Sequence, residues 1–99
     1  MKNKNLLKTA IRSTERYSDS QYKVFDLLID LASGSEVSAS AKFIIERTKL
    51  TMPTVYSALK ILQKDNILVK SPSANNTYKF NQEKLEEVTE LHNNKISIE

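Results

Sequence analysis

The sequence has no cysteine, no tryptophan and one glycine among its 99 residues. Without cysteine, neither a disulfide framework nor a thiolate metal site is possible. A single glycine, Gly34, is too few for the glycine-rich loops that hold phosphates. No stretch approaches the roughly 20 consecutive apolar residues that a membrane span needs, and the first residues lack the apolar core of a secretion signal. We therefore expect a soluble, cytoplasmic protein without a cofactor.

Side chains for catalysis or metal binding are also scarce. The one histidine, His92, has no cysteine or second histidine with which to form a metal site, so we interpret it as a surface residue. Exposed carboxylates at helical spacing are usually solvated, and this applies to Glu83, Glu86, Glu87 and Glu90. The sequence therefore predicts neither a metal centre nor an enzyme.

The charges are sorted along the chain, although the net charge is only +3. Residues 1 to 18 and 37 to 80 are basic, whereas residues 19 to 36 and 81 to 99 are net acidic. The cations of the central block are Lys42, Arg47, Lys49, Lys60, Lys64, Lys70 and Lys79. A basic block inside a folded domain is typical of a polyanion partner such as nucleic acid, and an excess of lysine is also a common way to remain soluble.

Apolar periodicity predicts a helix over residues 20 to 33, a short strand around Val37 and a second helix up to Lys49. Serine and aspartate residues at 18 to 20 are candidate caps for the first helix, and Gly34 suits its C-terminal cap. Ser40 is the candidate cap of the second helix. The residues expected to face inward from that helix are Phe43, Ile44 and Ile45.

A third helix is predicted to begin at about Met52, because Pro53 is tolerated in a first turn and Thr51 can accept a hydrogen bond from a backbone N–H there. Its apolar stripe consists of Val55, Ala58, Leu59 and Leu62, with Ile61 at the edge. Its opposite side carries Pro53, Thr54, Tyr56, Ser57, Lys60 and Lys64. Two short helices joined by a tight turn are typical of a helix-turn-helix motif.

Beyond this motif, Asn66 suits a helix end, and "ILVK" and "TYKF" are predicted strands joined by the turn-rich loop "SPSANN". Asn81 is a candidate cap for a last helix. The apolar stripe of that helix is Leu85, Val88 and Leu91. The element order is that of a winged helix domain, so the predicted fold class is mainly α with a small β-hairpin wing.

The segment "SASAKFIIERTKLTMPTVYSALKILQKDNILVK" resembles the core of winged helix-turn-helix DNA-binding proteins. It departs from their pattern at Asn66, where glycine is usual, and at Lys49, where a lysine in a left-handed turn would be strained. Within this broad group, "MPTVYSALKIL", the small size and the C-terminal helix resemble TubR-type centromere-binding adaptors of tubulin-based plasmid or phage partition.

The resemblance implies a sequence-specific double-stranded DNA-binding protein that reads the major groove with its third helix and holds phosphate with a basic wing. The candidate DNA-binding residues are Lys42, Lys49, Thr51, Pro53, Thr54, Tyr56, Ser57, Lys60, Lys70 and Lys79. For each of them the alternative is an ordinary solvated side chain. The narrower resemblance implies a partition adaptor and autorepressor whose further partner is a filament-forming tubulin-like GTPase. The alternatives are a small transcriptional repressor without a partition role and a winged-helix protein-interaction module.

The ends of the chain carry the last predictions. Residues 1 to 17 are predicted as an N-terminal helix or arm, residues 18 to 92 as the DNA-binding domain and residues 93 to 99 as a flexible tail. Apolar stripes lie at both ends of a chain that is too short to bury them all well. We therefore expect a homodimer in which the N-terminal segment and the helix around 85 to 91 take part.

Overall fold

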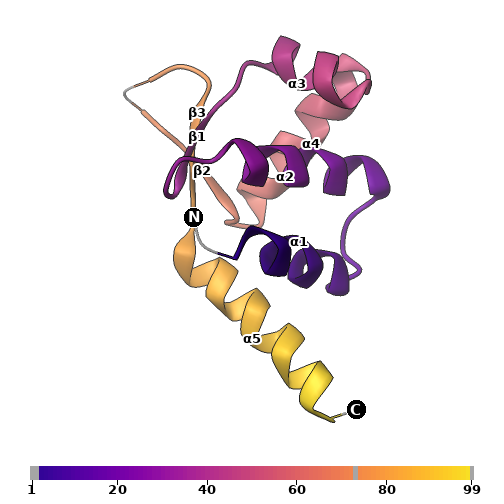
Figure 1. Ribbon diagram of the computed structural model, residues 1–99. Helices are drawn as coiled ribbons and strands as arrows, with labels where there is room; N and C mark the ends of the chain where they lie inside the picture. The colour runs from indigo at the N-terminus through magenta and orange to yellow at the C-terminus, as the bar shows by residue number, and fades with distance from the viewer. Residues whose placement is uncertain (1–2, 73, 99) are drawn as a thin grey trace.

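The structure, a computed structural model, describes residues 3 to 72 and 74 to 98, without the side chains of residues 95 to 98. The elements are α1 (Lys4–Ser13), α2 (Asp19–Leu31), β1 (Glu36–Ser38), α3 (Ala41–Thr48), α4 (Met52–Lys64), β2 (Leu68–Lys70), β3 (Thr77–Phe80) and α5 (Gln82–Ile98). The strands form an antiparallel sheet in the order β1-β3-β2 (Figure 1). This is a winged helix-turn-helix fold, which confirms the predicted fold class.

The start of α2 follows the local signals closely. Ser18 is the N-cap and forms a capping box with Gln21, since each side chain binds the backbone N–H of the other residue. The helix ends at Leu31, earlier than predicted, because Ala32 is already extended. Gly34 is left-handed at φ 63°, but it lies in the turn closed by the bridge between Ser33 and Glu36. The prediction that Gly34 caps α2 was therefore wrong.

The helix-turn-helix consists of α3 and α4. The hydroxyl of Ser40 accepts from the N–H of Phe43 at 3.1 Å, as predicted. Pro53 lies in the first turn of α4. Thr51 precedes α4 without capping it by its side chain, because its Oγ1 is hydrogen-bonded to Oγ1 of Thr54 at 2.8 Å. The predicted capping contact of Thr51 with a backbone N–H was wrong, and the first turn of α4 is closed by paired hydroxyls instead.

The core lies between the helices and the sheet. Phe25 of α2 and Phe80 of β3 meet edge to face, with ring centroids 6.0 Å apart. The predicted apolar stripe of α4 is buried at Val55, Ala58, Leu59 and Leu62. Of the inward-facing residues predicted in α3, Ile44 is fully buried, whereas 36% of Phe43 is exposed. The prediction that Phe43 faces inward was wrong.

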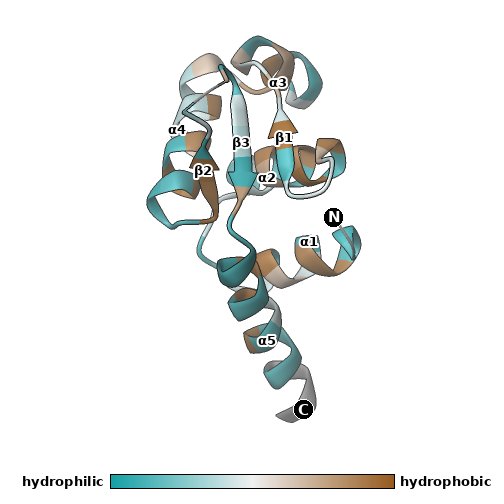
Figure 2. Cartoon of the chain, turned by 90° about the vertical axis from the view of Figure 1, so that its left-hand side faces the viewer, coloured by the Kyte–Doolittle hydropathy of each residue, from teal (hydrophilic) through white to brown (hydrophobic). Residues whose placement is uncertain are grey.

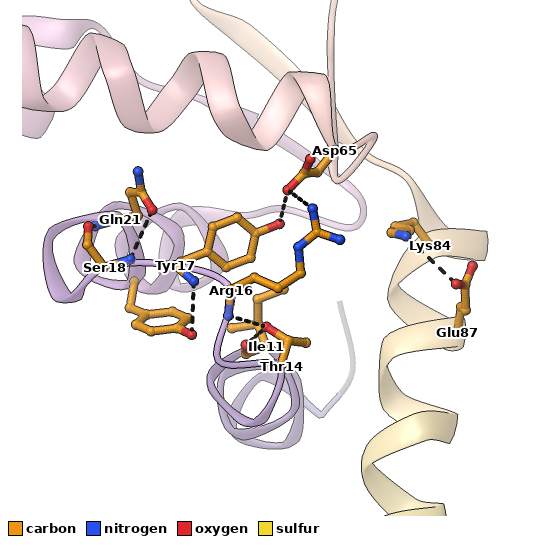
Figure 3. A network of polar contacts seen from close by, with 10 residues as sticks. Ile11, Thr14, Arg16, Tyr17, Ser18, Gln21, Asp65, Lys84 and Glu87 are labelled. Atoms are coloured by element: carbon orange, nitrogen blue, oxygen red, sulfur yellow. Dashed lines mark hydrogen bonds and ion pairs between the residues drawn. The ribbon is translucent and has the colours of Figure 1, made fainter.

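The N-terminal segment is a helix docked on the core. Ala10 and Ile11 of α1 are buried, and two ion pairs join α1 to α2: Lys8–Asp30 at 2.6 Å and Arg12–Asp26 at 2.7 Å. The loop after α1 is held on the end of α4. There the hydroxyl of Tyr17 donates to Asp65 at 2.6 Å and Arg16 lies 3.3 Å from the same carboxylate (Figure 3).

The last helix begins as predicted, since Oδ1 of Asn81 accepts from the N–H of Lys84 at 3.3 Å. It then continues to Ile98, so residues 93 to 98, predicted as a flexible tail, extend α5. The sequence between 82 and 98 has no proline or glycine that would end the helix. Glu99 lies outside the described residues. Within those residues, none of the helices is both long and apolar enough to cross a bilayer.

Candidate nucleic-acid interface

The outer face of α4 is the first part of the candidate site. We use this name for the exposed side chains Met52, Pro53, Tyr56, Ser57, Lys60 and Lys64. At about 100° per residue, Pro53 and Lys60 lie at the centre of this face, with Tyr56 on one flank and Ser57 on the other. Thr54 is only half-exposed beside this face, because its hydroxyl is paired with Thr51. The helix therefore presents the predicted polar side, apart from Thr54, away from the core.

Tyr56 lies on the flank nearest the wing, by which we mean the β2–β3 hairpin, residues 68 to 80. Burial raises the pKa of Tyr78 on β3, and the nearby phenol of Tyr56 raises it further. The strand register pairs Tyr78 with Lys70. Because residues paired across a sheet lie on the same face, Lys70 lies on the side of the wing that faces Tyr56. Lys70 thus lies on the same face of the sheet as Tyr78.

Lys79 lies on the other side of the wing. In the register it is paired with Glu36 on one neighbouring strand and with Val69 on the other. Successive residues of a strand point to opposite faces, so Lys79 points away from the face that carries Tyr78 and Lys70. The structure does not bring Lys79 together with the other predicted DNA-binding residues. The loop between the strands, "SPSANN", has no charged residue, so the basic part of this side of the wing is Lys70 alone.

The remaining cations near the motif belong to α3 and the turn. Lys42 is exposed in the first turn of α3, and Lys49 is exposed in the turn before α4. Arg47 was not among the predicted site residues. Its guanidinium lies 5.5 Å from the ring centroid of Phe43, a cation–π contact on the surface of α3. The spacing of four residues on one helix was the signal that could have found this pair.

Cations on the two sides of the molecule differ in their partners. Among the described residues at the N-terminal end, Lys8, Arg12 and Arg16 form ion pairs with aspartates, and Lys4 donates a hydrogen bond to the carbonyl of Asp30. In the part of the chain that the structure describes, none of the seven cations between residues 37 and 80 forms an ion pair with an acidic side chain. A polyanion at the motif would therefore meet positive charges without breaking existing ion pairs.

Replacement of Lys49 by glycine is expected to stabilise the protein. Lys49 has φ 62°, a left-handed conformation that costs a residue with a Cβ about 1 kcal/mol or more. Glycine avoids this strain, which stabilises the folded state, but its greater freedom in the unfolded chain offsets part of the gain. We therefore expect the free energy of unfolding, measured with urea, to rise by roughly 0.5 kcal/mol. Asn66→Gly is the matched control at φ 62°, and because asparagine tolerates this conformation, a smaller gain is expected there.

No protein family and no curated protein matches the chain in sequence. Among solved structures, the chain is similar to one titled "Crystal structure of reduced CprK in absence of any ligand", with 26% identity and a TM-score of 0.48. The similarity covers 81% of this chain and 43% of that one, so this chain matches less than half the length of its neighbour. A similarity at this TM-score does not transfer a function to the chain, and the interface described above follows from its own geometry.

Proposed function

We propose that this protein binds double-stranded DNA at a specific site, with α4 in the major groove and Lys70 on the phosphate backbone. The observation that carries the proposal is that α4 exposes hydrogen-bonding side chains while the described cations of the motif and wing have no acidic partner. The major groove admits a helix, and base edges there are distinguished by hydrogen bonds. Phosphate contacts add affinity that does not depend on sequence.

Each part of the interface has a separate role in this proposal. Ser57 can both donate to and accept from a base edge, and Tyr56 can reach or stack beside it. Lys60 suits either a guanine edge or a phosphate. Lys42 and Lys49 before α4 and Lys70 beyond it supply phosphate contacts on both sides of the groove. We leave Lys79 out of the interface because it points from the opposite face of the sheet.

The contrasting function, a protein-interaction module, is favoured less by the charges. An interface with a protein is usually depleted of lysine at its core, whereas Lys60 lies at the centre of the outer face of α4.

Repression would follow from occupation of a site near a promoter. The partition role and the tubulin-like GTPase partner need a further binding surface. They stay predictions from the resemblance.

Selection from a random DNA library would test the proposal. The purified protein is incubated with random duplexes over a salt series, and the retained duplexes are sequenced. We expect one motif to be enriched, and a duplex carrying it to be bound at least tenfold more tightly than a scrambled duplex of the same composition. Retention without an enriched motif would mean that binding is not specific, and no retention even at low salt would overturn DNA binding altogether.

A further inference from the structure

The C-terminal end of α4 carries a carboxylate that the helix itself does not favour. Asp65 is the C-cap of α4, and its side chain is only 13% exposed. The C-terminal end of a helix has a partial negative charge, which repels an acidic side chain. Burial of a charged group adds a further cost unless the group is paired and hydrogen-bonded. Partners of Asp65 outside α4 therefore offset these costs.

Two side chains from the loop after α1 hold this carboxylate (Figure 3). The hydroxyl of Tyr17 donates to Oδ2 of Asp65 at 2.6 Å, and Arg16 lies 3.3 Å from the same oxygen. Burial raises the pKa of Tyr17, and the hydrogen bond to Asp65 raises it further. Tyr17 therefore keeps its proton, and remains a donor to Asp65, at every physiological pH.

Tyr17 is itself fixed on α2. Its ring meets the ring of Tyr22 edge to face, with centroids 5.8 Å apart, and its backbone N–H donates to the Tyr22 hydroxyl at 3.3 Å. Tyr22 is buried in α2. A chain of contacts thus runs from a buried residue of α2 through Tyr17 to the end of α4.

The rest of α4 is held on the core by contacts of a different kind. Apolar and polar residues alternate along α4 in Figure 2, and the buried ones are Val55, Ala58, Leu59 and Leu62. Burial of apolar side chains has no preferred direction. A short hydrogen bond to a carboxylate, in contrast, fixes both a distance and an angle.

We propose that Tyr17 and Asp65 are positioning residues for the outer face of α4. Their hydrogen bond fixes the rotation and the axial shift of α4 against the rest of the domain, and with them the direction in which Tyr56 and Ser57 point. The consequence for DNA rests on the proposed function. Base edges are read by hydrogen bonds that weaken steeply with poor angles, so loss of this contact lowers the preference for the cognate site.

The first test contains no DNA and uses Tyr17→Phe, which removes one hydroxyl and keeps the ring. We expect NMR amide shifts to change along all of α4, including Tyr56 and Ser57, which lie about 12 Å or more from Asp65 along the helix. The changes there should be at least three times those caused by Thr89→Val, a matched control that removes a hydroxyl hydrogen bond of 2.8 Å within α5. Asp65→Asn keeps an acceptor oxygen for Tyr17, so it should change these shifts less than Asp65→Ala.

The second test compares cognate and scrambled duplexes. Tyr17→Phe should lower the ratio of the two affinities at least fivefold and leave the salt slope unchanged, because no phosphate contact is lost. Thr89→Val should leave the ratio unchanged. An equal fall for Thr89→Val would mean that any lost hydrogen bond has this effect, and would overturn the positioning role.

The two tests separate this proposal from the proposed function. Amide shifts that change only next to Tyr17 and Asp65 would overturn the positioning role, whether or not the protein binds DNA. A wild-type protein that binds its site, with a Tyr17→Phe variant of unchanged preference, would overturn it as well and leave the proposed function intact. Shifts along all of α4 in a protein that binds no DNA would support the positioning of α4 and overturn the proposed function instead.

Discussion

Replacement of both Lys49 and Lys70 by glutamine is expected to weaken binding to every DNA duplex by roughly 100-fold at low salt. These lysines lie on either side of α4 and have no acidic partner in the described structure. If each loses a charged hydrogen bond to phosphate worth about 1.5 kcal/mol, the two losses together give this factor. The slope of log affinity against log salt should flatten by about 1.8, because each lost phosphate contact removes about 0.9. Fluorescence anisotropy over a salt series measures both quantities.

The matched control removes two cations from α1 instead. Lys8→Gln with Arg12→Gln changes the net charge by the same amount, but both side chains are already paired with aspartates of α2. We expect the salt slope to stay unchanged and the free energy of unfolding to fall by about 0–1 kcal/mol for each partly exposed pair. If this control weakens DNA binding as much as the replacement of Lys49 and Lys70, then total charge governs binding and the proposed surface is wrong.

The starts of α2, α3, α4 and α5 could be predicted from the sequence because their signals are local. Ser18, Ser40 and Asn81 each cap the helix that follows, and the buried stripe of α4 follows from its period. Thr51 shows the limit of such signals. Its hydroxyl has two partners within one turn, a backbone N–H and the hydroxyl of Thr54, and it binds the second. A capping pattern alone does not decide between them.

The site was predictable only where helix geometry governs it. The outer face of α4 follows from the spacing of its residues, whereas the position of Lys79 depends on the pairing of three strands. The alternation in "TYKF" carried part of that information, since Tyr78 and Phe80 are buried and Lys79 between them must point the other way. Arg47 was missed because its contact with Phe43 requires that an apolar ring stay at the surface, contrary to the usual pattern.

Replacement of Ser57 by alanine is expected to reduce the preference for the cognate site without changing binding to random DNA. Ser57 is exposed on the outer face of α4, and alanine is a better helix former, so the fold should be retained. Loss of a base-edge contact should cost about 1–3 kcal/mol on the cognate duplex. Tyr56→Ala should behave in the same way. Tyr56→Phe tests the hydroxyl alone, because it keeps the aromatic ring. Competition between cognate and scrambled duplexes measures the preference.

Lys64→Ala provides the control within the same helix. Lys64 is exposed on the outer face of α4 but lies in its last turn, whereas a recognition helix contacts base edges mainly with its N-terminal residues. We therefore expect Lys64→Ala to affect cognate and scrambled duplexes equally, if it affects either. Equal losses on both duplexes for Ser57→Ala and Tyr56→Ala, with circular dichroism showing folded variants, would mean that α4 does not read bases. A preference that falls for Lys64→Ala but not for Ser57→Ala would place the reading end of α4 at its C-terminus, contrary to the proposed docking.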